Sequence, residues 1–538
     1  MADLATAVHV VPGHSSMLDR RFTRRPSRVG VWIFLLALIA GLGYIAVHLA
    51  HDLGNVTING VWPYLLLGVA LTIALGFEFV NGFHDTANAV ATVIYTNSMS
   101  PQMAVVWSGL CNLAGVLLSS GAVAFAIIAL LPVNLILKVS SGTGFAMVFA
   151  LLIAAILWNL GTWWFGLPAS SSHTMVGSII GVGLASQLMS PHAGASGLNW
   201  GQVLKVLEAL LFSPLLGFFM AAILLLLSKW LLRFPKLYEA PKGSEPPPWP
   251  IRLLMIGTCT GVSYFHGSND GQKGMGLIML ILIGTVPTAY AINHNATVAE
   301  VQSFIAASVQ TERILERHVP PGTPDPNPRA EVTNYIQNKQ LQPGTLLAMS
   351  QLVGELTREI SGYKTLKSIP AQEQTSIRND MYLTGRALQL MDRAHDPAFT
   401  AEERAGLKSY ENRLDKTTKY IPDWVKVAVA LALGLGTMVG WKRIVVTVGE
   451  RIGKEEMTYA QGAAAGLVTM VTIFAADAWS LPVSTTHILS SGVAGTMSAN
   501  GSGLRLSTVR NIAAGWIFTL PAAALLSGLL YLLFHAIF

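Results

Sequence analysis

The stretch "FVNGFHDTANAV", Phe79–Val90, follows the apolar run "YLLLGVALTIALGF" and places His84 and Asp85 at its centre. A carboxylate inside a bilayer costs ~2.5–3.5 kcal/mol or more, so it persists where a cation, a proton or a partner compensates its charge. Asn81 and Gly82 are poor helix formers, and we expect them to interrupt a membrane helix here. The backbone groups freed by such a break need a ligand, water or a neighbouring helix.

The composition is that of a membrane protein. Of the 538 residues, 52% are hydrophobic and 12% are charged, and the mean hydropathy is +0.50. Apolar runs that approach or exceed the length of a membrane span recur along the chain, at 29–50, 61–80, 103–131, 145–165, 203–232, 276–291, 424–439, 462–476 and 513–538. Alternating ten-residue strands are absent, which favours an all-α polytopic membrane protein with about 10–12 transmembrane helices.

Charge and hydropathy divide the chain into five parts. Residues 1–28 are basic and are placed in the cytoplasm by the positive-inside rule. Residues 29–50 predict an extra N-terminal transmembrane helix, 61–232 a first transport repeat, and 251–293 with 421–538 a second. Residues 294–420 predict a soluble, mostly helical insert. Because the insert has as many acidic as basic residues, the net charge of +6 belongs to the membrane part, where basic residues flank spans and indicate orientation rather than nucleic-acid binding.

The repeat is visible in two pairs of motifs. "FVNGFHDTANAV" matches "YFHGSNDGQKGM", Tyr264–Met275, at an offset of 185 residues, and "LPASSSHTMVGS" matches "LPVSTTHILSSG" at an offset of 314. Duplicated units with interrupted helices are typical of secondary transporters, whose substrate sites lie near the bilayer midplane. We therefore predict two inverted repeats with broken helices and re-entrant hairpins, working by alternating access.

Asp85 and Asp270 occupy equivalent positions in the two copies and are the first candidates for binding coupling ions. The alternative is that each caps a helix. Glu78 and Asp477 also lie in apolar stretches but have no acidic counterpart, so we favour them less. His84 and His266 lie beside the aspartates and can relay protons, or donate to a backbone carbonyl instead.

Each "LP" motif continues with three hydroxyl residues, Ser170, Ser171 and Ser172 in the first copy and Ser484, Thr485 and Thr486 in the second. Pro168 and Pro482 should end one helix, and the hydroxyls should begin the next, so that amides and hydroxyls are offered to an oxyanion. The alternative is that these hydroxyls cap their own helices. The sequence contains no nucleotide-binding loop, nucleophile elbow or zinc spacing, so we expect no enzyme and no resident metal or cofactor.

With the motifs "GFHDTANA", "GSNDGQKG", "LPASSSHT" and "LPVSTTH", the sequence resembles the inorganic phosphate transporter (PiT) family, in its low-affinity bacterial phosphate permease branch. The resemblance covers roughly 60–300 and 420–538. It implies that Asp85, Asn88 and Asp270 bind phosphate or the coupling cation and that the hydroxyl stretches form hairpin tips. Asn269 and Gln272, which belong to the second motif, join the expected phosphate ligands.

The chain departs from the family pattern at Phe83 and His84 in the first copy and at Gln272 and Lys273 in the second. Lys273 stands where the first copy has Asn88. Our hypothesis is that its tethered ammonium occupies the charge space that a mobile Na⁺ fills in sodium-coupled relatives, which leaves protons as the coupling ion.

The sequence thus predicts a proton-driven importer of inorganic phosphate in the bacterial inner membrane, multi-pass and surrounded by lipid. The resemblance adds a homodimer and phosphate carried partly as a neutral divalent-metal complex. Alternatives are a sulfate or other oxyanion permease, a Na⁺-coupled phosphate symporter, a channel, and an intramembrane hydrolase, although a hydrolase should have its catalytic groups once rather than twice.

Overall fold

The computed structural model describes residues 28–54, 62–131, 142–189, 198, 200–243, 245–290, 292–395, 399–418 and 420–537. The basic N-terminus predicted at 1–28 therefore lies outside the described residues, except for Arg28. Within these ranges all regular secondary structure is helical.

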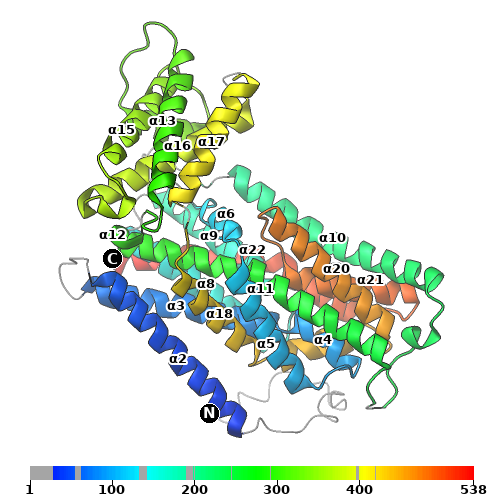
Figure 1. The fold of residues 1–538 in the computed structure, drawn as a ribbon. Coiled ribbons are helices and arrows are strands. Elements are labelled where there is room, and N and C mark those ends of the chain that lie inside the picture. The colour runs from blue at the N-terminus through cyan, green and yellow to red at the C-terminus, as the bar shows by residue number, and fades with distance from the viewer. Residues whose placement is uncertain are drawn as a thin grey trace.

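Most of the helices form one membrane bundle, and a group of five others is stacked at one end of it (Figure 1). The bundle contains α2 (Arg28–Leu53), α3 (Trp62–Asp85), α4 (Ala87–Tyr95), α5 (Pro101–Leu118), α6 (Ala122–Ile128), α8 (Gly142–Trp164), α9 (Ser171–Met189), α10 (Trp200–Leu231), α11 (Trp249–Thr285), α12 (Pro287–Tyr290), α18 (Asp423–Thr437), α19 (Lys442–Val446), α20 (Tyr459–Ala478), α21 (Thr485–Asn500) and α22 (Leu506–Ile537). The stacked group contains α13 (Val298–Arg317), α14 (Pro328–Asn338), α15 (Thr345–Ser361), α16 (Ala371–Ala394) and α17 (Ala401–Thr418), all within residues 294–420.

Length and composition identify seven described helices that can cross a membrane, or eight if α18 and the segment after it, which bend by 56°, form one span. This is fewer than the expected 10–12. One reason is that the apolar run at 276–291 is not a separate span, since most of it is the C-terminal part of the 37-residue helix α11. A polytopic helical membrane protein is nevertheless what the structure shows.

The outer helices carry large apolar side chains on their exposed faces. Trp32 of α2 is 66% exposed, Phe219 of α10 58% and Leu525 of α22 66%. Exposed apolar surface of this extent is unfavourable in water but not in lipid. The faces of α2, α10 and α22 therefore mark the lipid-facing perimeter.

The helices that carry the two aspartate motifs are not broken where the sequence predicted. α3 continues through Asn81 and Gly82 to Asp85, and only Thr86, with helical dihedral angles of φ −50° and ψ −39°, separates it from α4. α11 passes through Asp270 without interruption. The expected break at Asn81–Gly82 and its counterpart in the second copy are therefore wrong.

The glycines in these motifs have a packing role instead. A Cβ atom at Gly82 would lie 2.3 Å from the carbonyl oxygen of Leu433 on α18, and one at Gly267 would lie 2.2 Å from that of Asn112 on α5. Small residues allow two helix backbones to approach this closely inside a membrane. Gly82 and Gly267 thus place the aspartate helices directly against a helix of the other copy.

The hydroxyl stretches, in contrast, are real interruptions. α8 ends at Trp164 and α9 begins at Ser171, and α20 ends at Ala478 and α21 begins at Thr485. α9 then packs along α22, and α21 along α10, so that each hydroxyl-bearing helix lies against a long helix from the other copy.

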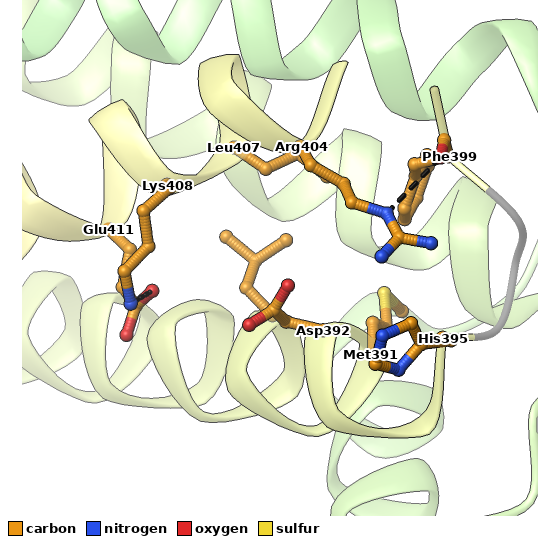
Figure 2. Close-up of a pocket in the computed structure, with 9 residues that line it drawn as sticks. Met391, Asp392, His395, Phe399, Arg404, Leu407, Lys408 and Glu411 are labelled. Carbon is orange, nitrogen blue, oxygen red and sulfur yellow. Dashed lines mark hydrogen bonds and ion pairs between the residues drawn. The ribbon is translucent and has the colours of Figure 1, made fainter. Parts of the chain in front are cut away.

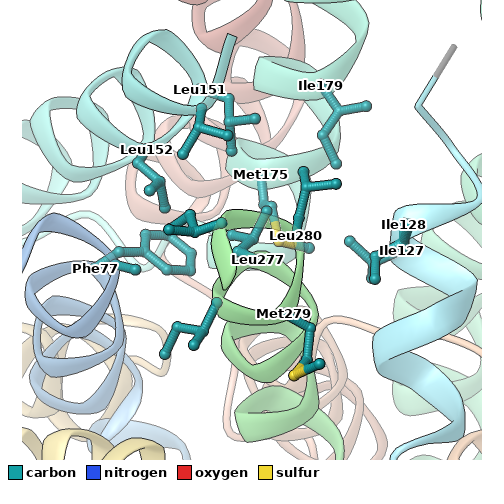
Figure 3. Close-up of a cluster of buried hydrophobic side chains, with 14 of the residues drawn as sticks. Phe77, Ile127, Ile128, Leu151, Leu152, Met175, Ile179, Leu277, Met279 and Leu280 are labelled. Carbon is teal, nitrogen blue, oxygen red and sulfur yellow. The ribbon is translucent and has the colours of Figure 1, made fainter. Parts of the chain in front are cut away.

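The apolar core of the bundle surrounds α11 beyond the aspartate motif. Leu277, Met279 and Leu280 of α11 lie among buried side chains from α3, α6, α8 and α9 (Figure 3). Because α11 is wrapped in apolar side chains here, the position of its polar segment at 266–273 is fixed along the axis of the bundle.

Candidate functional site

Asp85 lies at the point where the two hydroxyl stretches meet. Ser171 donates a hydrogen bond to its Oδ2 at 2.6 Å, and Thr486 donates one to its Oδ1 at 2.8 Å. His84 Nδ1 lies 3.2 Å from the same Oδ1. Asp85 is only 3% exposed, so its charge is balanced by these neighbours rather than by water.

Asn88 extends this contact to the second hydroxyl stretch. Its side-chain amide donates to Thr485 Oγ1 at 3.0 Å and to Thr486 Oγ1 at 2.9 Å. Because the Thr486 hydroxyl in turn donates a hydrogen bond to Asp85, the amide, hydroxyl and carboxylate form a chain of hydrogen bonds. Side chains from α4, α21 and the end of α3 are thus joined.

Asp270 is neutralised by its own helix. The Lys273 ammonium lies 2.7 Å from Asp270 Oδ1, one turn further along α11, and both side chains are 1% exposed. Lys273 also donates to Ser172 Oγ. Ser172 in turn donates to the backbone carbonyl of Val483 at 2.8 Å. The two interruptions therefore touch each other directly, beside the lysine.

His266 stands between the two aspartates. Its Nε2 is 3.8 Å from Asp85 Oδ2 and 3.7 Å from Asp270 Oδ2, and has no hydrogen-bond partner. Its Nδ1 lies 2.8 Å from Asn112 Oδ1, and Asn112 donates to Thr437 Oγ1. The sequence analysis missed Asn112, although an asparagine in the apolar run at 103–131 was a signal that could have identified it.

Three of these groups can hold a cation together. Asp85, His266 and Asp270 each offer one ligand atom, and these atoms lie within 4.8 Å of one another. All three residues are buried. Carboxylate oxygens suit hard cations, and an imidazole nitrogen suits a proton as well.

Three of the expected phosphate ligands face elsewhere. Ser170 and Ser484 accept hydrogen bonds from the amides of His173 and His487 and so cap their own helices, at 3.2 Å in each case. Asn269 donates to the carbonyl of Leu481 at 3.1 Å. The structure does not bring these side chains to Asp85.

Gln272 points away from the hydroxyl stretches as well. Its Oε1 accepts from the amide of Val123, and its Nε2 donates to the carbonyl of Ser268 and to Asp477 Oδ1. Its side chain thus connects α11 to the start of α6 and to the C-terminal end of α20, as well as to a carbonyl of α11 itself.

A model of the phosphate transporter family matches residues 81–527, which is most of the chain. The chain belongs to the phosphate transporter family. It is 43% identical over 484 residues to the low-affinity inorganic phosphate transporter PitA of Escherichia coli K12, with 87% of this chain and 96% of PitA covered. It is 41% identical to PitB of the same strain over 488 residues, with 88% and 97% covered.

These alignments are longer than the part of the chain outside 294–420. The similarity to these members of the phosphate transporter family therefore extends into the insert, which the motif resemblance had left mostly outside. A solved structure, "The sodium-dependent phosphate transporter", covers 88% of this chain and 100% of its own at 18% identity and a TM-score of 0.47, an overlap too weak to carry an argument. The family and these relatives are named as transporters, in agreement with the expectation that this chain is not an enzyme.

Glu78, a less favoured candidate from the sequence, lies close to the site around Asp85 and Asp270. Its side chain is 0% exposed, and neither carboxylate oxygen has a hydrogen-bond partner among the residues that the structure describes. It rests against Gly274 of α11, where a Cβ atom would lie 2.3 Å from Glu78 Oε1. Asp477, by comparison, accepts hydrogen bonds from Ser268 and Gln272 and is held in place by them.

Proposed function

We propose that this member of the phosphate transporter family imports inorganic phosphate with low affinity, as a symport with protons and by alternating access. The observation that carries the proposal is the contact of Asp85 with one hydroxyl from each copy, Ser171 at 2.6 Å and Thr486 at 2.8 Å. The names of the Escherichia coli relatives supply the substrate. We place this import in the bacterial inner membrane.

Neutral donors bind the anion in this proposal. When Asp85 takes up a proton or a cation, the hydroxyls of Ser171 and Thr486 are released from it and can turn towards phosphate oxygens, together with the amide of Asn88. Hydroxyls and amides bind an oxyanion in a desolvated site without the larger desolvation cost of a second ammonium. Phosphate can also donate a hydrogen bond to a carboxylate, whereas sulfate cannot, which favours phosphate here.

Positive charge must accompany the anion. Each negative charge that enters against an inside-negative potential costs about 2.3 kcal/mol per 100 mV. Asp85, His266 and Asp270 lie close enough to hold the compensating protons, or a divalent cation that travels with phosphate as part of the cargo. The ammonium of Lys273 is tethered 2.7 Å from Asp270, which supports protons rather than Na⁺ as the mobile partner.

The pairing of the two copies supports alternating access. The motif histidines His173 and His487 are equivalent in the repeat, and their rings lie 4.4 Å apart. Equivalent residues that meet lie near an axis relating the two copies. We infer that the copies are inverted, that the hydroxyl interruptions act as hairpins, and that rocking of one copy against the other exposes the site alternately. A homodimer completes the proposal.

Uptake by proteoliposomes tests the function. We expect labelled phosphate to accumulate under an inward proton gradient without Na⁺, with competition by arsenate and little by sulfate. Accumulation that requires a Na⁺ gradient and ignores pH would contradict proton coupling. Competition by sulfate equal to that by phosphate would favour a general oxyanion permease.

A further inference from the structure

A cavity of about 110 Å³ lies where the insert meets the membrane bundle. Phe125 and Ile128 of α6 and Ile283 of α11 form its apolar wall on the bundle side. α16 and α17 of the insert form the other side, as their position next to α6 in Figure 1 indicates. One ordered water needs roughly 10–15 Å³ of such space, so the cavity has room for a phosphate-sized group.

Two arginines of α16 line this cavity without a carboxylate partner. Arg386 is 8% exposed, and its guanidinium donates a long hydrogen bond to Gln389 Oε1 at 3.4 Å. Arg378 donates to Asn379 Oδ1 and lies over the ring of Tyr382, 5.6 Å from its centroid. Within the part of the chain that is described, neither arginine forms an ion pair.

The surroundings leave a positive charge in the cavity. Asp415 of α17 also lines the cavity, so that two guanidinium groups face one carboxylate there, and Arg393 of α16 adds a further positive field at Arg386. Burial lowers the pKa of both Arg378 and Arg386. A buried guanidinium is costly unless an anion and hydrogen bonds compensate it.

The same helix shows how an arginine partner is normally provided. Arg329 of α14 reaches Asp380 of α16 with two hydrogen bonds of 2.7 Å, the bidentate geometry of a guanidinium and a carboxylate. Arg386 lies further along α16 and has no such acid. Its planar group of donors is suited to a phosphate as well as to a carboxylate.

A second cavity, inside the insert, provides the contrast (Figure 2). It measures about 20 Å³. In its lining, Lys408 lies 2.6 Å from Glu411, and Arg404 donates to the carbonyl of Phe399. The arginine there needs no ligand, which makes Arg404 a matched control.

We propose that the cavity between α16 and the bundle binds a phosphate group, held by Arg378 and Arg386. The group belongs either to inorganic phosphate or to the headgroup of an acidic lipid, since both present the same oxygens. Ile283 lies ten residues beyond Lys273, or about 15 Å along the helix at 1.5 Å per residue. Occupation of the cavity therefore contacts the helix that carries Asp270.

Arginine labelling with phenylglyoxal, read residue by residue by mass spectrometry, tests this proposal on the full chain. The chain is placed in phosphatidylcholine nanodiscs alone, with added inorganic phosphate, or in nanodiscs that contain phosphatidylglycerol. When inorganic phosphate or phosphatidylglycerol is present at three times its dissociation constant, we expect the labelling rate of Arg386 to fall about fourfold. Arg404 should be labelled equally in all three samples.

The labelling results distinguish the two possible sources of the phosphate group. Protection by inorganic phosphate assigns a free phosphate site, and protection by phosphatidylglycerol alone assigns a lipid site. Equal labelling of Arg386 in all three samples would overturn the proposal, and so would protection that persists undiminished in Arg378→Gln. Arg386→Lys, which keeps the charge, and Arg404→Gln serve as checks that the insert still folds. Labelling does not require transport, so this result stands apart from the proposed function.

Discussion

The two aspartates occupy equivalent positions in the repeat but have opposite surroundings. Asp85 is balanced by hydroxyl donors from both copies and by a histidine, whereas Asp270 is paired with the ammonium of Lys273 on its own helix. The first arrangement can be undone by one proton or cation, because its donors are neutral and belong to separate segments. The second is permanent. In the proposed symport, the first copy therefore responds to the coupling ion, and the second holds the counter-charge on its own helix.

The sharpest way to break this comparison is Asp85→Asn. It removes the negative charge that strengthens two hydrogen bonds, each worth ~1.5–3 kcal/mol, and turns one of the two acceptor oxygens into an NH₂ donor, so we expect phosphate uptake to fall by about 100-fold or more. Asp477→Asn is the matched control, since Asp477 also accepts two side-chain hydrogen bonds but does not belong to the group of Asp85, His266 and Asp270. Uptake by Asp85→Asn equal to that of the control, at similar protein content in the membrane, would count against the site.

Lys273→Asn gives the second copy the residue of the first. Removing one partner of a buried ion pair leaves an uncompensated charge at a cost of ~3–5 kcal/mol, so uptake without Na⁺ should fall at least about tenfold. Added Na⁺ should restore part of it by occupying the space beside Asp270.

The double variant Asp270→Asn/Lys273→Asn, which has no charge to compensate, is the control and should not respond to Na⁺. Unchanged Na⁺-free uptake by the single variant would show that the ammonium is dispensable.

Ser171→Ala and Thr486→Val test whether the two copies contribute equally to the first aspartate. Each removes one hydrogen bond to Asp85 and one hydroxyl that binds phosphate in the proposed function. We therefore expect the half-saturating phosphate concentration to rise about tenfold, the equivalent of ~1.4 kcal/mol. Kinetics of uptake at a fixed pH gradient measure this. A large effect of one variant and none of the other would place the contact in one copy alone.

Ser170→Ala and Ser484→Ala should have the smallest effect on transport. These hydroxyls cap α9 and α21, and losing a cap costs ~1 kcal/mol of stability. A lower unfolding temperature with uptake close to that of the unchanged protein is the expected result. Loss of uptake without loss of stability would move them from capping to binding.

Local chemistry explains what the sequence could predict. Pro168 and Pro482 lack an amide hydrogen and the following hydroxyls cap a new helix start, so the interruptions between α8 and α9 and between α20 and α21 were visible in the motifs themselves. The membrane helices followed from apolar length. The number of spans did not, because an apolar run such as 276–291 does not show that it is the end of a longer helix, here α11.

The glycines show where local reasoning failed. Gly82 and Gly267 are equally compatible with a break and with a close helix crossing, and only the presence of Leu433 and Asn112 against them decides for a crossing. In the same way, the six hydroxyls look alike in the sequence, but Ser170 and Ser484 turn back to their own helices. The direction of Gln272 likewise depends on α6 and Asp477, which lie far away in the chain.

The sequence by itself determined that this chain is a polytopic helical membrane protein with a duplicated set of aspartate and hydroxyl motifs, because hydropathy, proline and hydroxyl capping act over a few residues. The tertiary structure decided which of those side chains meet. Asp85, His266 and Asp270 form one cluster, and Arg378 and Arg386 line one cavity, only because helices distant in sequence pack together. Contacts of that kind depend on crossing points between helices, and no local pattern specifies them.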